Sequence, residues 1–341
     1  MNAKMKPRID LVNRTALETV IPLDTPFILM VEPTDACNFQ CKFCPTGDRA
    51  LMKTITNRQQ RPMEFSLYKK IVDDCRAFPR KIRVMRLYKD GEPLLNRRFS
   101  DMVAYAKKMD VCERVDTTTN AALLTHELSD RVIDAGLDRI NISIEGVNAM
   151  QYLDFSGVKL DFEKLVGEID YFYQHRNQCE MIVKINGDSL SEEDKDQFYQ
   201  IFGDIADGVS IESVMSCWHD FELKDVKENK EVGVYGQPLT SVDVCPYVFY
   251  EMAINADGTA SVCFLDWMRT MLIGDVHKQS VREIWDGTER YGYLAMFLRH
   301  ERSTHDICRK CGQLTHGAPD DIDKFAEALL PKVLARMGGQ G

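Results

Sequence analysis

The chain has 341 residues, of which 44% are hydrophobic and 28% charged, so it can bury a large core and form one large domain with a smaller one. Its 43 basic and 53 acidic residues give a net charge of −10 without a dense basic segment, which disfavours nucleic acid as a partner. The start is polar, and no apolar stretch approaches the roughly 20 residues that span a membrane. We therefore expect a cytoplasmic protein that makes no membrane contact.

The first two thirds of the chain alternate short apolar runs with helical patterns. Strands are predicted at 28–32, 82–88, 114–118, 139–145, 181–185 and 209–214. Helices are predicted between them, at 66–78, 99–109, 126–135, 162–175 and 192–205. Such an alternation is typical of repeated βα units, so the expected class is α/β with a parallel sheet.

The last third of the chain has a different pattern. Apolar residues flank Asp257-Gly258, which is a strong turn signal and predicts a β-hairpin over 250–264. Helices are predicted at 281–285, 290–299 and 321–337, the last with a kink at Pro331. We divide the chain into an N-terminal extension (1–26), a barrel (27–217), a polar connector (218–242), a small domain (243–318) and a C-terminal helix and tail (319–341).

Eleven cysteines in a chain without a secretory signal favour metal or redox use over a disulfide framework. Cys37, Cys41 and Cys44, the first cysteine group, directly follow the first predicted strand, at the end where barrels carry active sites. Three thiolates can bind three irons of a 4Fe-4S cluster and leave the fourth iron open. A structural zinc site is the alternative, but no His or Cys follows soon after Cys44.

The Cys-x3-Cys-x2-Cys spacing, with an aromatic residue before the last cysteine, resembles the motif of the radical S-adenosylmethionine (radical SAM) superfamily. The resemblance implies a partial (β/α)6 TIM-type barrel in which the cluster binds SAM and cleaves it reductively. The product is a 5′-deoxyadenosyl radical that abstracts hydrogen from a substrate. The resemblance also implies that Phe43 packs near the adenine and that flavodoxin or ferredoxin donates the electron.

A second segment that resembles the family follows the second strand. Asp90-Gly91-Glu92-Pro93 is similar to the GGEP motif, whose backbone and acid hold the amino group of SAM. Asp90 is a departure, because glycine is usual at its position. Since the contact is partly made by the main chain, we expect this segment, including Glu92, to keep its role.

Polar residues after later strands resemble further SAM contacts. Asn120, Ser143 and Glu145 correspond to contacts to the ribose and carboxylate of the cofactor. Lys184 and Asn186 are candidates for contacts to the cofactor or the substrate. Ordinary turn chemistry or a solvated strand end is the alternative for each residue taken alone.

Cys245, Cys263, Cys308 and Cys311 form the second cysteine group, which can complete a cluster without an open position. The arrangement of a hairpin, a helix and Cys-x2-Cys resembles the small α+β twitch or shortened SPASM domain, which holds one auxiliary 4Fe-4S cluster. Its spacing is similar to that of twitch-domain aminocyclitol dehydrogenases. A four-cysteine zinc ribbon is the alternative.

The sequence does not identify the side chain that acts as the catalytic base. Cys75, Cys112 and Cys179 read as buried thiols. Cys217 follows the sixth strand at the catalytic end and is a candidate to face the substrate. His219, Asp220 and Glu212 lie near the same strand end, where surface charge is the alternative to a role as base.

The resemblance implies that a closed auxiliary cluster accepts an electron from a substrate radical. We therefore expect oxidation or epimerisation of a small, carbohydrate-like substrate, such as a sugar or cyclitol alcohol. Peptide maturation is the first alternative, which the short segment before the first strand disfavours, because even a small recognition domain needs about 50 residues. A non-catalytic zinc-binding module is the second alternative.

Overall fold

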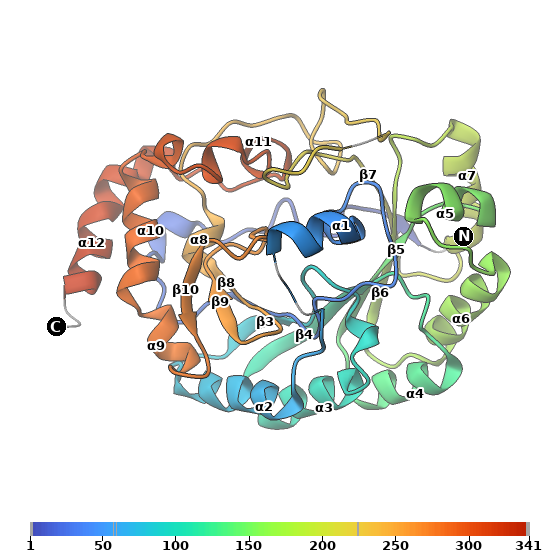
Figure 1. Ribbon diagram of the computed structural model, residues 1–341, viewed down its shortest axis with the longest axis horizontal. Coiled ribbons are helices and arrows are strands. Elements are labelled where there is room, and N and C mark those ends of the chain that lie inside the picture. The colour runs from blue at the N-terminus through green and yellow to red at the C-terminus, as the bar shows by residue number, and fades with distance from the viewer. Residues whose placement is uncertain (1–2, 57, 59, 224, 339–341) are drawn as a thin grey trace.

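The computed structural model describes residues 3–56, 58, 60–223 and 225–338. A parallel sheet lies at its centre, and its strands follow one another in chain order (Figure 1). These strands are β2 (Ile28–Val31), β3 (Ile82–Arg86), β4 (Cys112–Thr119), β5 (Arg139–Ile144), β6 (Glu180–Asn186) and β7 (Gly208–Glu212). The predicted α/β class and partial barrel are confirmed.

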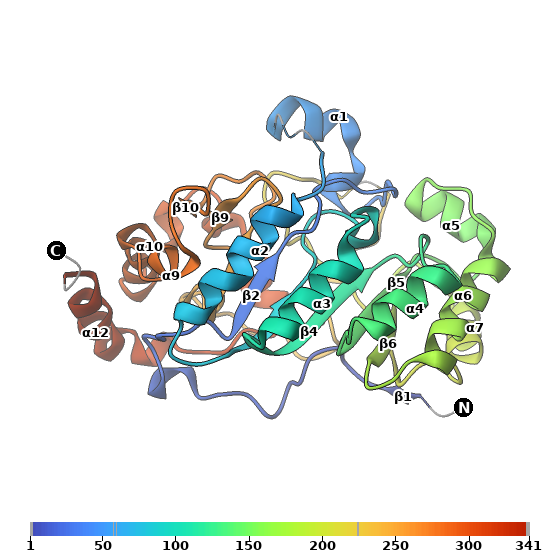
Figure 2. The ribbon, with the colours of Figure 1, turned by 90° about the horizontal axis from the view of Figure 1, so that it is seen from below.

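The predicted helices cover the outer face of this sheet (Figure 2). They are α2 (Phe65–Asp74), α3 (Phe99–Met109), α4 (His126–Asp134), α6 (Phe162–His175) and α7 (Glu192–Phe202). Their ends follow local signals, such as the capping box at Ser191, whose hydroxyl accepts from Asp194 N–H. Four of the described helices were not predicted: α1 (Arg49–Leu51), α5 (Ala149–Ser156), α8 (Tyr247–Tyr250) and α11 (Gln313–His316).

The strands are amphipathic, which is unusual for a parallel sheet buried on both faces. Met85, Val115 and Val183 belong to the hydrophobic core. Their neighbours along the chain, such as Arg86 and Lys184, line a cavity on the other face. Because side chains alternate along a strand, the inside of the barrel is polar and hollow, whereas its outside is apolar and packed.

The predicted hairpin is confirmed, and it extends the barrel sheet. β8 (Glu251–Ile254) pairs parallel with β2, and β9 (Thr259–Ser261) pairs antiparallel with β8. Gly258 has a φ of +89°, which glycine adopts without strain. β10 (Leu272–Asp275) follows β9, and β1 (Lys4–Met5) pairs with β7 at the other edge. The described strands therefore form one sheet that carries both cysteine groups.

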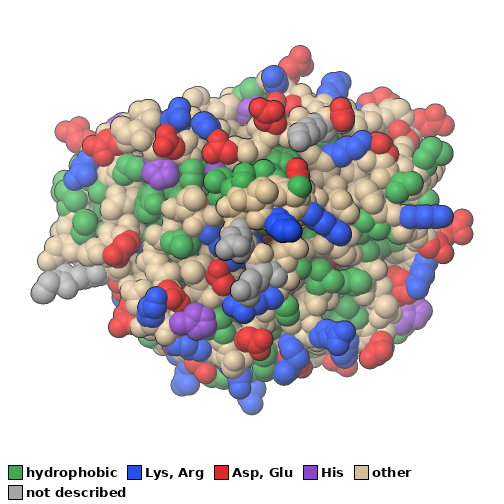
Figure 3. All heavy atoms as spheres, viewed as in Figure 1, with side chains coloured by type: hydrophobic (Ala, Val, Ile, Leu, Met, Phe, Trp, Pro, Cys, Tyr) green, Lys and Arg blue, Asp and Glu red, His purple; other side chains and the backbone are tan. Residues whose placement is uncertain are grey.

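The last third of the chain also forms helices (Figure 1). They are α8 (Tyr247–Tyr250), α9 (Val281–Trp285), α10 (Thr288–Leu298), α11 (Gln313–His316) and α12 (Ala326–Gly338). Helix α12 continues through Pro331. No helix in the described ranges is both long and apolar enough to cross a membrane. On the face shown in Figure 3, basic and acidic side chains are interspersed.

Candidate active site

The first cysteine group lies on the loop between β2 and α1. Cys44 N–H donates to the Cys41 carbonyl at 3.1 Å, and Gly47 N–H donates to the Cys44 carbonyl at 3.0 Å, so the loop turns tightly. Burial, together with the nearby Glu92 and Cys44, raises the pKa of Cys37 to about 12. Thiols in such a place ionise when iron supplies positive charge. Three free thiols on one loop fit a 4Fe-4S cluster with an open iron.

Helix α5 positions this loop. Gln40 N–H donates to the Ser156 carbonyl at 2.8 Å, and Lys42 N–H donates to the Phe155 carbonyl at 3.1 Å. The ring of Phe43 lies 5.4 Å from that of Phe155, centroid to centroid, and lines the cavity. The place of Phe43 beside the cysteines is therefore set by a helix that the sequence pattern did not reveal.

The segment after β3 packs against the cysteine loop through its backbone. A Cβ atom on Gly91 would lie 2.2 Å from the Thr34 carbonyl oxygen, so only glycine fits there. The Glu92 carboxylate accepts hydrogen bonds from Thr119 Oγ1 at 2.6 Å and Asn120 N–H at 2.8 Å. Glu92 therefore ties β3 to the end of β4, and its carboxylate is already engaged within the protein.

Asp90 takes part in a buried ion-pair network. Its Oδ2 accepts from Arg58 Nη1 and from Lys89 Nζ, each at 2.8 Å. Burial alone would raise the pKa of Asp90, but these two cations hold it below its usual value. Lys89 also donates to the Asp266 carbonyl at 3.2 Å, near the second cysteine group. The departure from glycine thus links the two halves of the site. Pro93 is buried and begins a short 3-10 helix.

The remaining predicted SAM contacts divide into two sets. Ser143, Glu145 and Asn186 line the cavity at the carboxyl ends of β5 and β6. Burial raises the pKa of Glu145 to about 7, against the opposing charge of Lys184. Asn186 Nδ2 is buried and has no hydrogen-bond partner among the described residues. This unused donor fits a polar ligand such as SAM. Asn120 instead donates to Asn38 Oδ1 at 2.9 Å and holds the loop.

The second cysteine group gathers around the hairpin. Cys245 precedes α8 and Cys263 follows β9. Besides burial, the nearby Cys311 raises the pKa of both thiols, and Cys245 also raises that of Cys263. Arg302 donates to the carbonyls of Cys308 at 2.9 Å and Cys311 at 3.0 Å, which fixes the Cys-x2-Cys turn. Arg302 was not predicted as a site residue. An arginine six residues before Cys308 carries no signal of its own.

Cys217 lies between the two cysteine groups and lines the cavity. Burial raises the pKa of its thiol, and Cys311 and Cys44 raise it further. A Cβ atom on Gly312 would lie 2.3 Å from the Ser216 carbonyl oxygen, so the chain around Cys217 packs directly on the Cys-x2-Cys turn. The structure therefore brings Cys217 to the catalytic end of the barrel.

The other candidates at the end of the sixth predicted strand differ in their burial. Glu212 and His219 are buried, so the surface-charge interpretation is wrong for both. Glu212 lines the cavity, 3.3 Å from Lys184 Nζ. Asp220 lies at the surface and pairs with Lys310 at 2.5 Å. Of the three, Glu212 alone lines the cavity.

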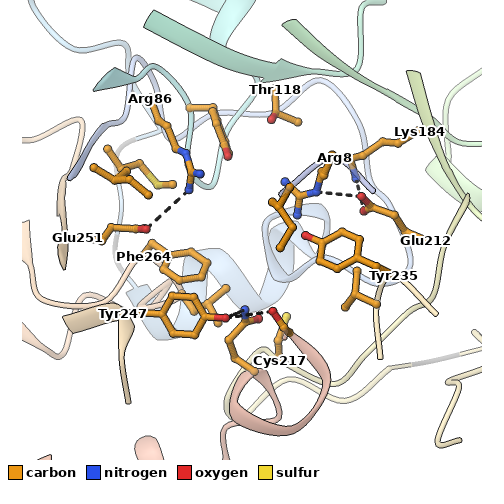
Figure 4. Close-up of a pocket in the computed structure, with 18 of the residues that line it drawn as sticks. Arg8, Arg86, Thr118, Lys184, Glu212, Cys217, Tyr235, Tyr247, Glu251 and Phe264 are labelled. Carbon is orange, nitrogen blue, oxygen red and sulfur yellow. Dashed lines mark hydrogen bonds and ion pairs between the residues drawn. The ribbon is translucent and has the colours of Figure 1, made fainter. Parts of the chain in front are cut away.

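The cavity has a volume of about 610 Å³, which suits a small ligand. At one side it reaches Phe43, next to the first cysteine group. At the other it reaches Phe264 and Gln313, next to Cys263 and Cys311 of the second group. Figure 4 shows Phe264 and Cys217 facing the same space. A ligand in this space lies between the two groups.

The remaining cysteines, Cys75, Cys112 and Cys179, are buried, as predicted. No three His, Cys, Asp or Glu side chains in the described part of the chain converge closely enough to hold a single metal ion.

Comparison with known proteins gives two family matches. Residues 31–199 match the model of the radical SAM superfamily, and residues 245–312 match that of SPASM, an iron-sulfur cluster-binding domain. The second match spans the whole second cysteine group. It favours an iron-sulfur cluster there over zinc.

Solved structures share the fold at low sequence identity. BtrN in complex with AdoMet and 2-DOIA has a TM-score of 0.52 at 17% identity, over 83% of this chain and 92% of that one. SuiB of Streptococcus suis, bound to the precursor peptide SuiA, has a TM-score of 0.62 at 12% identity, over 92% and 79%. Native anSMEcpe with bound AdoMet has a TM-score of 0.60 at 10% identity, over 92% and 100%.

Proposed function

The chain belongs to the radical SAM superfamily and carries a SPASM domain after its radical SAM domain, and on this premise we propose that it oxidises or epimerises an alcohol of a small sugar or cyclitol. The first cysteine group would hold the SAM-binding 4Fe-4S cluster, and the second would hold one auxiliary cluster. The domain boundaries predicted from the sequence are part of this proposal.

One observation carries the proposal: a single cavity is lined by Phe43, next to the first cysteine group, and by Phe264 and Gln313, next to the second. When bound, the SAM cluster supplies a radical that removes a hydrogen atom, and the auxiliary cluster supplies an acceptor for the remaining electron. Removal of a hydrogen atom, a proton and an electron from one alcohol carbon and its hydroxyl gives a ketone. A substrate that fills this cavity lies within reach of both groups.

The chain's own residues position the substrate. Lys184 donates to Glu212 at 3.3 Å, and the pair presents a donor and an acceptor to the cavity. Ser143 and Asn186 add a hydroxyl and an amide near the SAM side. Alternating donors and acceptors suit a polyol, whose hydroxyl groups both donate and accept. The aromatic side chains of Phe43 and Phe264 add apolar surface to the lining of the cavity.

Deuterium transfer tests the proposal. The anaerobic holoenzyme is incubated with reductant, SAM and either ring-deuterated sugars and cyclitols or deuterated peptides. We expect deuterium in 5′-deoxyadenosine only with the carbohydrate set, together with a ketone or an epimer. Transfer from peptides alone would establish the maturase alternative, and the absence of SAM cleavage with active reductant would contradict both.

A further inference from the structure

Three arginine side chains line the part of the cavity that lies inside the barrel. They are Arg8 from the segment after β1, Arg86 from β3 and Arg114 from β4. The Nε atom of each is buried and lacks an aligned hydrogen-bond partner in the described part of the chain. The rest of each side chain is partly exposed to the cavity, and a buried donor that stays unused destabilises the fold.

The carboxylates of Glu251 and Asp116 lie near these arginines but at long distances. Arg86 Nη1 lies 3.7 Å from Glu251 Oε2, and its Nε lies 3.9 Å from Asp116 Oδ2. Arg114 Nη2 lies 3.5 Å from the same Asp116 oxygen. These distances exceed the 2.7–3.2 Å of a good N–H···O bond. For comparison, the buried ion pair between Arg58 and Asp90 has a distance of 2.8 Å.

On the opposite wall of the cavity, the contact between Arg8 and Glu212 is also poorly aligned. Arg8 Nε lies 2.9 Å from Glu212 Oε1 but is not aligned as a hydrogen bond, and Lys184 shares that carboxylate. Figure 4 shows Arg86 with Glu251 on one side of the space and Arg8 with Glu212 and Lys184 on the other. The side chains of both sets face the gap between them.

The charge in this region is more basic than that of the chain. Seven basic and five acidic side chains line the cavity, although the chain carries a net charge of −10. The carboxyl of Asp116 lies within electrostatic range of Arg8, Arg86 and Arg114 at once. Burial raises the pKa of Glu251 to about 7, which removes part of the negative charge near neutral pH.

We propose that Arg86, Arg114 and Arg8 bind an anionic group of the substrate, a phosphate or a carboxylate, inside the barrel. The planar fork of a guanidinium matches two oxygens of either group, which would occupy the unused donors. The substrate of the proposed reaction is then a polyol that carries a phosphate or carboxylate. The reaction rests on the proposed function, whereas anion binding does not depend on SAM cleavage.

Isothermal titration calorimetry of the anaerobic holoprotein tests this assignment. The probes are inorganic phosphate, succinate and uncharged myo-inositol. We expect heat of binding with at least one anion and weaker binding or none with myo-inositol. Binding of phosphate alone assigns a phosphorylated substrate, and binding of succinate alone assigns a carboxylated one. If neither anion binds, the assignment is wrong, whatever the deuterium experiment shows.

Charge variants separate binding from a structural role. Arg86→Gln should weaken anion binding about tenfold or more, because charge-assisted hydrogen bonds are lost. Glu251→Gln should tighten it several-fold, because it removes a competing carboxylate. Arg80→Gln is the matched control, since its side chain is 67% exposed and lies outside the cavity. Equal affinities across these variants would overturn the proposal. If Arg86→Gln does not fold, Arg114→Gln and Glu251→Gln decide in the same assay.

Discussion

Gly91 lies where the main chain of the cysteine loop leaves no room for a side chain. A Cβ atom there would sit 2.2 Å from the Thr34 carbonyl oxygen. We expect Gly91→Ala to destabilise the protein by about 1–3 kcal/mol and to slow SAM cleavage, because the loop must shift. Gly167→Ala is the control, since no atom lies within 4 Å of its Cβ position on α6. Thermal unfolding and SAM-cleavage rates that are the same for both variants would contradict the account.

The carboxyl group of Glu251 makes the stability of the protein depend on pH. Burial raises its pKa from 4.5 to about 7, so the folded state keeps a proton that the unfolded state loses. Stability therefore falls as the pH rises from 4.5 to 7, by on the order of 3 kcal/mol in all. Glu251→Gln removes this loss. The Tm of the variant relative to wild type should be higher at about pH 8 than at about pH 6. A Tm difference that does not change between these pH values would refute the assignment.

Helix α5 acts at the scale of an element. Asn148 caps it by accepting from the N–H groups of Met150 and Gln151, and its last turn holds the cysteine loop. We expect Asn148→Ala to cost about 1 kcal/mol of stability and also to slow SAM cleavage. Thr125→Ala removes the cap of α4, a helix that packs against α3 and α6. It should lower Tm by a similar amount and leave cleavage unchanged. Equal cleavage rates in the two variants would mean that α5 is only structural.

Some helices and strands could be predicted from the sequence and others could not. Strands β2 to β7 were predicted because apolar runs recur between helical patterns. Helix α5 has only eight residues and a weak apolar stripe, so its pattern was not recognised. Its signals were the Asn148 cap and Gly157, which ends it with a φ of +67°. Strand β1 is two residues long and exists only through its pairing with β7, which local sequence does not encode.

At the scale of the whole molecule, the two cysteine groups were identified from spacing, but their relation was not. That relation depends on the pairing of β8 with β2, which connects residues more than 200 positions apart. The arginines inside the barrel were also missed, because Arg8, Arg86 and Arg114 lie far apart in the sequence and only the closed sheet brings them together. Long-range pairing therefore decides what local patterns leave open.

The contrast between Cys37→Ala and Cys308→Ala tests the central claim, that one cavity couples radical formation at the first group to electron removal at the second. Cys37→Ala should abolish SAM cleavage, because the SAM-binding cluster loses a ligand. Cys308→Ala should retain SAM cleavage and hydrogen abstraction yet lose the oxidised product. The measurement is the ratio of ketone to 5′-deoxyadenosine in each anaerobic holoenzyme, with iron content determined on the same samples. We predict a ratio near zero for Cys308→Ala. A ratio equal to that of wild type would contradict the account.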